Sequence, residues 1–467
     1  MENLTQHQLN LPGWVKDAVF YEIFPDRFNN GDKQNDPPDV SRWGDPPTRD
    51  NFFGGDLQGI LDKLDYLEEL GITALYLTPI FKANTNHKYD TADYLEIDPA
   101  FGSIDLLKKL VSKAHNKGIR VVLDGVFNHC GYDFWAFQDV RKNGATSRFA
   151  QWFFPQSFPI QNEPPNYSAC FGAGDLPKLN TTNPDVIDYL LKVGTYWIEK
   201  CDIDGWRLDT AWKVPMDFWR AFRERIKNKK PDAYIVGEVF RYMEHWVRGD
   251  TLDATMNYCL RDQILYFCSG EYADSEDFDY DNRCLQAIYG ATAPYQLNVL
   301  DSHDRMRLMT YYENDIHRII MAVVFNFTYM GAPLVYYGDE IGMHGGNDPD
   351  CRRTMIWDES EWNGEINTLY RTLIQVRNTH PALRSINFQT LLTFNGVYAY
   401  HRFLGEDEAI VIMNPNQDSP ALKIPLPKTT TKTQWRDLLT GKIFTAISGY
   451  LCFDKILEKS TYLLFPL

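Results

Sequence analysis

The sequence predicts an α/β fold in which a parallel (β/α)8 barrel is followed by a smaller antiparallel β domain. Two observations lead to this fold class. From about residue 18 to residue 380, short apolar runs alternate with amphipathic stretches of helical length, which is typical of a parallel sheet with crossover helices. In addition, four of the apolar runs end in acidic or imidazole side chains, and a parallel barrel gathers the carboxyl ends of its strands on one face.

Eight apolar runs are expected to form the barrel strands. They cover residues 18–24, 73–78, 119–124, 202–209, 233–239, 252–256, 297–300 and 333–338. The helices between them are expected at residues 57–70, 104–117, 184–200, 215–229, 316–327 and 365–378. Asp56 stands at the N-cap position of the first helix and Gly118 follows the second, which are the residue types that begin and end helices.

The pattern divides the chain into a barrel unit at residues 1–385 and a C-terminal unit at residues 386–467. Within the barrel unit, residues 130–180 lack clean periodicity and are rich in Pro, Gly and aromatic residues. A segment of that length without regular structure is uncommon in a compact domain and is usually functional. Residues 386–467 alternate β-rich runs with turns and predict an antiparallel β-sandwich.

Composition and charge argue against several classes of protein. The chain has 467 residues, 44% of them hydrophobic, which is enough for one large barrel and an accessory domain. A net charge of −16 disfavours binding to nucleic acid or to an anionic membrane. No apolar run approaches a membrane span, and residues 1–15 contain no apolar signal-peptide segment. The eight cysteines form no CxxC pair, so we expect reduced thiols, a cytoplasmic location and no zinc site.

The run at residues 202–209 is expected to end in a charged pair. Arg207 and Asp209 lie two residues apart, so on an extended strand both side chains point to the same side. A cation beside a carboxylate keeps that carboxylate ionised, as a nucleophilic carboxylate requires. Taken alone, this octamer is equally compatible with a solvated ion pair at the end of a surface strand.

Three further runs deliver polar side chains at the same end of a strand. These side chains are Asp124, Asn128, His129, Glu238, His303 and Asp304. Unrelated ion pairs on a solvated surface are a poor explanation for four apolar strands that all end in this way. Because the carboxyl ends of barrel strands meet on one face, the sequence predicts a single active site there.

The four stretches resemble the conserved regions of the α-amylase family, glycoside hydrolase family 13. They read DGVFNH, GWRLD, GEVF and VLDSHD, and they occur in the family's order at residues 124–129, 205–209, 237–240 and 299–304. The stretches DLPKLN and NHKYDTAD, at residues 175–180 and 86–93, are similar to the neopullulanase, cyclomaltodextrinase and maltogenic amylase subfamily. The resemblance runs from residue 20 to about residue 355, and it implies a TIM barrel with a small inserted domain at residues 130–180.

One departure from that subfamily concerns the N-terminus. Its members usually carry an N-terminal β domain that helps to form a dimer and to roof the active site. This sequence starts almost directly at the first expected strand, so we expect that domain to be missing. A monomer and a homodimer therefore both stay open, and the subfamily's narrow-pocket substrate preference does not simply carry over.

The resemblance implies glycoside hydrolysis with retention, which needs a nucleophile and an acid/base carboxyl about 5–5.5 Å apart. Asp209 fits the nucleophile because Arg207 should hold it ionised. Glu238 fits the acid/base because apolar neighbours at a strand end should raise its pKa. Asp304 fits the third carboxylate, which binds sugar hydroxyls.

Nine residues are expected to contact the sugar: Tyr89, Asp90, His129, Arg207, Trp212, Lys213, His303, Asp348 and Arg352. Tyr89 would stack under the ring in the first donor subsite, and the two histidines would bind hydroxyls. Asp348 and Arg352 would close the nonreducing side of the pocket by resemblance, although a simple loop ion pair explains them equally well.

The segment after the nucleophile departs from the subfamily. Where relatives often show VANE, this chain has Thr210-Ala-Trp-Lys213, so Lys213 replaces an acceptor-side glutamate. Trp212 is expected to give acceptor sugars a stacking face, and the alternative is a buried core plug.

A calcium ion (Ca2+) is expected near the N-terminal end of the first helix. The turn-rich stretch at residues 29–38 carries amide and carboxylate oxygens, which calcium prefers, although plain turns have the same composition. Some neopullulanase-like relatives bind calcium at the matching positions, which are Asn30, Asp32, Asn35, Asp36, Gly54 and Asp56.

The sequence therefore predicts a retaining α-glucan hydrolase that cleaves α-1,4 glucosidic bonds in maltodextrins, cyclodextrins or pullulan, with cleavage of α-1,6 bonds left open. The alternative within the family is a debranching α-1,6-glucan hydrolase or an α-glucosidase. A catalytically inactive sugar-binding subunit is the alternative from another class, and the presence of all three carboxylates argues against it.

Overall fold

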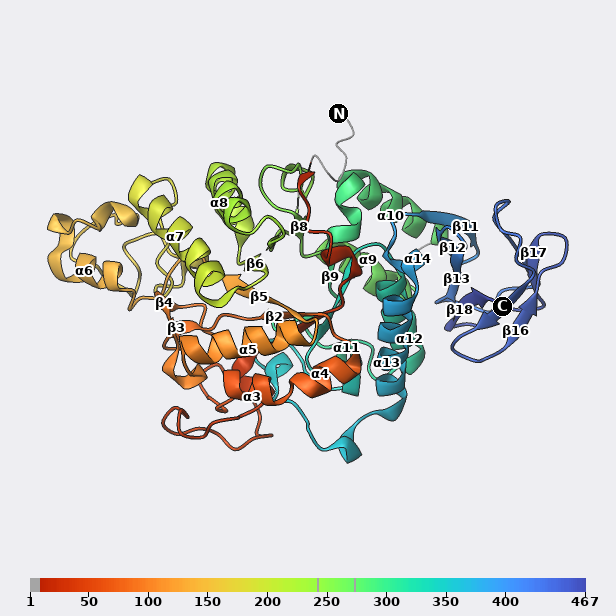
Figure 1. The fold of residues 1–467 in the computed structure, drawn as a ribbon, viewed down its shortest axis with the longest axis horizontal. Helices are drawn as coiled ribbons and strands as arrows, with labels where there is room; N and C mark the ends of the chain where they lie inside the picture. The colour runs from red at the N-terminus through yellow and green to blue at the C-terminus, as the bar shows by residue number, and fades with distance from the viewer. Residues whose placement is uncertain (1–8, 242, 273) are drawn as a thin grey trace.

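The computed structural model describes residues 9–241, 243–272 and 274–467, so the expectation for residues 1–15 lies partly outside the described residues. Figure 1 shows a helix-covered barrel, with the antiparallel C-terminal domain at one end of the long axis. The inserted segment with α6 (Trp135–Asn143) lies at the opposite end.

Eight parallel strands form the barrel, in the order β8-β7-β6-β5-β2-β1-β10-β9. Their bounds are β1 Phe20–Ile23, β2 Ala74–Leu77, β5 Arg120–Gly125, β6 Gly205–Leu208, β7 Tyr234–Gly237, β8 Ala254–Thr255, β9 Leu297–Asn298 and β10 Ala332–Tyr336. A parallel bridge between Met256 and Leu297 connects the two end strands. Nearly every strand residue is buried, as expected when helices cover the outside of a parallel sheet. The predicted (β/α)8 barrel is confirmed.

Helices surround the barrel. They are α2 Pro25–Phe28, α3 Leu57–Asp62, α4 Leu64–Leu70, α5 Ile104–Asn116, α7 Pro184–Cys201, α8 Met216–Lys229, α9 Tyr258–Cys268, α10 Ser275–Tyr289, α11 Leu308–Tyr311, α12 Ile316–Thr328, α13 Gly364–Thr379 and α14 Pro381–Arg384. The single helix expected at residues 57–70 is wrong, because Lys63 leaves the helical conformation (φ −104°, ψ 7°) and separates α3 from α4. Among the residues that the structure describes, no helix is long and apolar enough to cross a membrane.

Two elements beside the active face were not predicted, namely a β-hairpin and, within the expected inserted segment, helix α6. A hairpin of β3 (Phe81–Ala83) and β4 (Thr91–Ile97) follows the second barrel strand. Within residues 130–180, α6 packs Phe137 against the rings of Phe153 and Tyr167, with centroids 4.8 and 4.9 Å apart. A bridge between His129 and Lys178 returns this segment to the end of β5, so the inserted residues border the active face.

The C-terminal unit is built from antiparallel strands. Six of them form one sheet in the order β11-β12-β13-β18-β15-β16, and β14 pairs with β17. The bounds are β11 Phe388–Phe394, β12 Val397–Leu404, β13 Asp407–Asn414, β14 Leu422–Pro425, β15 Gln434–Asp437, β16 Ile443–Thr445, β17 Tyr450–Phe453 and β18 Ser460–Pro466. Ile424 and Leu451 of the small sheet share a buried cluster with Ile412 and Trp435 of the large one, so the two sheets pack face to face.

The junction of β8 and β9, which we call the seam, differs from the other strand pairs. Side-chain amides supplement the single bridge: the backbone N–H of Thr255 donates to Oε1 of Gln296 over 2.9 Å. Nδ2 of Asn257 likewise donates to Oδ1 of Asn298 over 2.9 Å. All four residues are buried. Their side-chain hydrogen bonds therefore satisfy polar groups that backbone hydrogen bonds would satisfy if the two strands paired over a greater length.

Candidate active site

Arg207 of β6 occupies the centre of the polar cluster at the active face. Its fully buried guanidinium contacts Oδ2 of Asp124 at 3.0 Å and Oδ1 of Asp209 at 3.2 Å. Nη2 also lies 3.3 Å from Oε2 of Glu238. The predicted same-side geometry of Arg207 and Asp209 is confirmed, and the interpretation as a solvated ion pair is wrong because both side chains are buried.

Asp209 is not held in its ionised form as firmly as the sequence suggested. Burial raises the pKa of its carboxyl to about 6, although Arg207 acts in the opposite direction. The carboxylate of Asp124 raises the pKa further, because it shares the same guanidinium. The sequence could not reveal this, since it does not show how deeply the strand end is buried.

Glu238 follows β7 and turns one carboxylate oxygen towards the protein. Oε2 accepts a hydrogen bond from the backbone N–H of Thr210 over 2.9 Å and is the oxygen nearest to Arg207. Burial raises the pKa of this carboxyl, and the charge of Asp209 raises it further, against the effect of Arg207. The direction of the shift agrees with the expectation for an acid/base, and Oε1 is the oxygen left to carry a proton.

Asp304 and His303 form a charged pair that reaches back to the first strand. Nε2 of His303 lies 3.2 Å from Oδ2 of Asp304, and its Nδ1 lies 2.5 Å from Oε1 of Glu22 in β1. Burial alone would lower the pKa of His303, but the two carboxylates raise it to about 10. His303 and Arg352 in turn hold the pKa of Asp304 far below its usual range, against the effect of desolvation, although the Asp304 side chain is 42% exposed.

Tyr89 joins this pair from the loop between β3 and β4. Its hydroxyl donates to Oδ2 of Asp124 over 3.0 Å and lies 2.7 Å from Nε2 of His303. The two rings are stacked, with centroids 5.6 Å apart and planes 16° apart. The phenol is therefore fixed at the edge of the carboxylate cluster.

His129 lies on the other side of the nucleophile candidate. Its Nδ1 is 4.0 Å from Oδ2 of Asp209 and accepts a hydrogen bond from Nδ2 of Asn128 over 3.2 Å. Burial, together with the charge of Lys213, lowers the pKa of His129 to about 3, so the ring is neutral. Its buried Nε2 has no hydrogen-bond partner among the described residues and can donate to a sugar hydroxyl.

Asp348 and Arg352 lie in the loop after β10. Arg352 bridges two carboxylates, with Nη2 2.9 Å from Oδ1 of Asp304 and Nη1 3.0 Å from Oδ1 of Asp348. The second oxygen of Asp348 faces Arg49 at 3.5 Å. The loop ion pair is therefore present, and it is attached directly to the third carboxylate.

Trp212 and Lys213 follow β6 in a short 3-10 helix, Ala211–Lys213. The Trp212 side chain is 44% exposed, so the alternative of a buried core plug is wrong. Nζ of Lys213 lies 3.1 Å from the ring centroid of Phe171 and 5.2 Å from that of Trp212. Phe171 is 73% exposed and adopts φ +51°, an uncommon conformation for a bulky residue.

Asp90 does not point freely into the site. Its carboxylate accepts hydrogen bonds from the backbone N–H groups of Asn84 and Thr85, and from the Thr85 hydroxyl. It therefore shapes the loop that carries Tyr89. Both carboxylate oxygens of Asp90 already accept hydrogen bonds from its own loop, so neither is free for the predicted contact with the sugar.

The residues expected to hold calcium lie together at the beginning of α3: Asn30, Asp32, Asn35, Asp36, Gly54 and Asp56. Nδ2 of Asn30 donates to Oδ1 of Asp36 over 2.7 Å, and Nδ2 of Asn35 donates to Oδ2 of Asp56 over 2.8 Å. The opposite amide oxygens, Oδ1 of Asn30 and Oδ1 of Asn35, are buried and have no partner among the described residues.

Asp56 is the least available of these carboxylates. It caps α3 by accepting from the Gly59 N–H over 2.6 Å, as predicted for an N-cap, and it also accepts from Gly31 and Asp32. Among the described residues, no group of three or more His, Cys, Asp or Glu side chains is arranged to hold a metal. The fit to calcium therefore depends on the two orphaned amide oxygens.

Several residues of the site were not singled out from the sequence. Glu22 lies within an apolar strand run, and Tyr76 donates to Asp124 over 2.5 Å from the neighbouring strand. Phe171 stands in the segment without periodicity. An acid in the middle of a buried run was the one available signal for Glu22, because such a charge needs a partner.

Comparison with known proteins supports the resemblance. The model of the α-amylase catalytic domain matches residues 22–380. A cyclomaltodextrinase of Geobacillus thermopakistaniensis is 46% identical over 458 residues, which cover 96% of this chain and 77% of that protein. Neopullulanase 2 of Thermoactinomyces vulgaris is 44% identical over 448 residues, covering 94% and 76%.

The solved structure of a cyclic α-maltosyl-(1→6)-maltose hydrolase from Arthrobacter globiformis superposes with a TM-score of 0.88. It is 39% identical, and the alignment covers 97% of this chain and 99% of that one. With the barrel, the inserted segment and the clustered carboxylates of the described residues, these matches show that the chain belongs to the α-amylase family of glycoside hydrolases.

Proposed function

We propose that Asp209 is the nucleophile and Glu238 the acid/base of a retaining α-glucan hydrolase. The observation that carries this proposal is the single guanidinium of Arg207, which lies within 3.3 Å of both carboxyl groups. It brings the two acids together, as a nucleophile and an acid/base that act on the same bond require.

In the first step, a carboxylate oxygen of Asp209 bonds to the anomeric carbon as the glycosidic bond breaks. Glu238 gives its proton, held on Oε1, to the leaving oxygen. In the second step, Glu238 takes a proton from water, the water oxygen bonds to the anomeric carbon, and Asp209 leaves as a carboxylate. Asp304 and Arg352 bind sugar hydroxyls, and Tyr89 stacks under the ring.

The favoured substrates are α-1,4-linked glucans, namely maltodextrins, cyclodextrins or pullulan. Cleavage of α-1,6 bonds is the second candidate, because the name of the solved Arthrobacter hydrolase contains that linkage and its alignment spans almost all of both chains. The exposed faces of Trp212 and Phe171 supply the acceptor side, with Lys213 between them.

Glu238→Gln tests the assignment. This change should lower hydrolysis of maltooligosaccharides by about 100- to 10,000-fold, because the general acid is lost while the fold is kept. Glu224→Gln, an exposed position on α8, is the matched control and should leave the rate unchanged. Full activity of Glu238→Gln contradicts the proposal, and a wild type that binds glucans without turnover supports the inactive sugar-binding subunit.

A chromatographic product profile then separates the substrate candidates. The wild type is incubated side by side with cyclodextrin, pullulan and a branched oligosaccharide. Linear maltooligosaccharides from cyclodextrin support α-1,4 cleavage, whereas maltotriose from pullulan or debranched chains support α-1,6 cleavage. Release of glucose alone from chain ends would point to an α-glucosidase.

We also propose a structural calcium ion at the loop before α3. The buried Oδ1 atoms of Asn30 and Asn35, the carboxylates of Asp32 and Asp36 and the Gly54 carbonyl would hold it. Oxygen ligands of this kind suit calcium, and the ion would stabilise the folded loop without a role in the chemistry. Asp56 would orient the loop through its hydrogen bonds.

A cytoplasmic location is proposed as well. All eight cysteines lie in the described residues as free thiols, a state that persists in a reducing compartment. The proposed partner is the glucan substrate, and no nucleic acid or membrane is expected. Monomer and homodimer are distinguished by sedimentation.

A further inference from the structure

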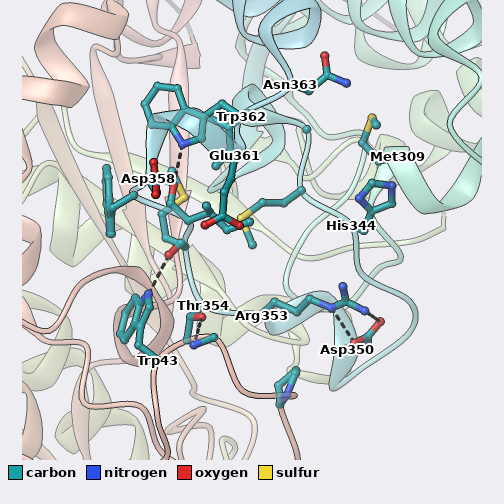
Figure 2. A pocket seen from close by; sticks show the side chains of 18 of the residues that line it. Trp43, Met309, His344, Asp350, Arg353, Thr354, Asp358, Glu361, Trp362 and Asn363 are labelled. Carbon is teal, nitrogen blue, oxygen red and sulfur yellow. Dashed lines mark hydrogen bonds and ion pairs between the residues drawn. The ribbon is translucent and has the colours of Figure 1, made fainter.

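A groove of about 990 Å³ lies outside the candidate active site. One wall is the loop after β10, from Ile341 to Asn363, and the other is the segment from Trp43 to Pro47. Figure 2 shows Trp43, Glu361 and Trp362 around this space. None of the three carboxylates assigned to catalysis lines it.

The loop after β10 separates the groove from the catalytic centre. Arg352 turns inwards to Asp304, but the next residue, Arg353, pairs with Asp350 in the lining of the groove, at 2.8 Å. The two consecutive arginines therefore point to opposite sides of the loop, Arg352 to the catalytic centre and Arg353 to the groove. A ligand in the groove would contact the outer side of the wall that closes the sugar pocket.

Three tryptophans in the lining are held in fixed orientations. The indole N–H of Trp43 donates to the Met355 carbonyl over 2.9 Å, and that of Trp362 donates to the Ile356 carbonyl over 2.8 Å. Trp357 donates to the Phe28 carbonyl over 2.8 Å. Because each N–H is already used by the backbone, what the half-buried Trp43 and Trp362 offer a ligand is ring surface, whereas the Trp357 ring is already contacted by Nζ of Lys63, 3.9 Å from its centroid.

The polar residues of the lining favour an uncharged ligand. The lining contains four acidic residues, Asp45, Asp350, Asp358 and Glu361, and one arginine, Arg353, so an anion would meet net negative charge. The Glu361 carboxylate is exposed and makes no hydrogen bond or ion pair with the described residues, which leaves both oxygens for hydroxyl donors. Flat apolar faces beside free carboxylate oxygens are the chemistry that binds a sugar ring.

We propose that this groove is a second binding site for a neutral α-glucan chain, separate from the catalytic site. The choice of an α-glucan rests on the proposed function, since it is the ligand that this enzyme meets. The groove holds the chain by stacking on Trp43 and Trp362 and by hydrogen bonds to Glu361. Long substrates then occupy both sites, whereas short ones fill the catalytic site alone.

Calorimetric titration with maltoheptaose tests the proposal in a Glu238→Gln background, where the ligand is not hydrolysed. Two binding events are expected. Glu361→Ala should weaken one of them several-fold, and adding Trp362→Phe should weaken it by about tenfold in total, as expected for a lost hydrogen-bond acceptor and a reduced stacking face. Glu359→Ala, in the same turn but outside the lining, is the matched control and should keep both events.

Kinetics of the active enzyme give a second readout. Glu361→Ala should raise KM for amylose several-fold and leave KM and kcat for maltotriose unchanged. A single binding event in the Glu238→Gln protein, or two events that Glu361→Ala does not alter, overturns the groove site. So does a shift in oligomeric state on Glu361→Ala, because it would show that another copy covers the groove. If instead the catalytic assignment fails, Glu238→Gln still turns over maltoheptaose, while Glu361→Ala still raises KM for amylose and leaves that for maltotriose unchanged.

Discussion

Nη2 of Arg207 lies 3.3 Å from Oε2 of Glu238, while Nη1 of the same guanidinium contacts Asp209 at 3.2 Å. One buried cation thus opposes, in both proposed catalytic groups, the rise in pKa that burial causes. A third carboxylate, that of Asp124, contacts the same guanidinium at 3.0 Å. The distance between the two carboxyls and their separate pKa values therefore depend on one side chain.

Arg207→Lys should lower kcat/KM by about 100- to 1000-fold, because a point charge cannot contact three carboxylates as a planar guanidinium does. The acid limb of the pH profile should also move upwards, since a lysine ammonium that cannot contact all three carboxylates opposes the effect of burial on Asp209 less strongly. Initial rates between pH 4 and pH 9 measure both effects. Arg223→Lys, which alters a buried ion pair with Asp253, is the control and should leave the limbs in place. An unchanged acid limb in Arg207→Lys would contradict the assignment.

The pH dependence of the wild type follows from the two raised pKa values. Activity requires Asp209 ionised, so it should fall as the pH drops through about 6. It also requires Glu238 protonated, so it should fall again as the pH rises through the raised pKa of that carboxyl. A bell-shaped profile of kcat/KM is expected, with its acid limb near pH 6, and a plateau that extends to pH 4 would be inconsistent with a buried Asp209.

Asp209→Asn should stabilise the protein at neutral pH. The pKa of this carboxyl is about 6 in the folded state and 3.8 in the unfolded state, so the folded protein binds the proton more tightly. The stability contribution of Asp209 is therefore present below pH 4 and is lost as the pH rises through 6. Urea denaturation should show a gain of about 1–3 kcal/mol at pH 8 relative to pH 4. Asp304→Asn should change stability with the opposite sign, because its pKa is lowered.

His303 should stay protonated well into the alkaline range. Its folded pKa is about 10, above the unfolded value of 6.5, so its contribution to stability is complete below pH 6.5 and is lost as the pH rises through 10. NMR of labelled histidine measures the titration directly. Glu22→Gln should lower the His303 pKa, since Glu22 lies 2.5 Å from Nδ1. A His303 resonance that titrates near pH 6.5 in the wild type would refute this charged pair.

The exposed rings of Phe171 and Trp212 should govern the acceptor side. Alanine at either position should raise KM for maltoheptaose by about tenfold and nearly spare a small activated glucoside that fills only the donor subsite. Melting temperatures should hardly change, because both side chains are exposed. Phe158→Ala, at a 38% exposed ring of the same inserted segment, serves as the control. A uniform loss on long and short substrates would argue against an acceptor role.

Calcium should raise the melting temperature if the loop before α3 binds it, because a ligand that binds only the native state stabilises that state. The measurement compares EDTA with added calcium. In Asn35→Leu the calcium effect should be smaller, since the buried Oδ1 is removed. Equal melting temperatures of the wild type in both buffers would speak against the site.

The sequence predicted the barrel and the proposed catalytic centre because their signals are local. Strand length, helix spacing and the two-residue spacing of Arg207 and Asp209 can all be read from neighbouring positions. Glu22 could not be assigned in this way: it contacts His303 only because β10 pairs with both β1 and β9 and so brings the residues after β9 close to β1. The pKa of Asp209 was misjudged for a related reason, since burial is set by the whole fold.

The positions of two other side chains could not be predicted, because amino-acid composition does not determine where a side chain lies in the fold. Phe171 stands in a segment without periodicity, and only the return of that segment to the end of β5 brings it to Lys213. Asp90 looked like a sugar contact by resemblance. Its carboxylate turned out to be occupied by the backbone of its own loop, which no sequence spacing reveals.

The seam between β8 and β9 gives the barrel a place to open. Along the other strand pairs a fluctuation must break a backbone ladder, but here it needs only to separate a single bridge and the amide pairs of Gln296 and Asn257. Local opening of a protein begins where few backbone hydrogen bonds hold. Amide protons of β8 and β9 should therefore exchange with solvent before those of β5 and β6. The barrel then opens first at β8, next to the strand that precedes the proposed acid/base.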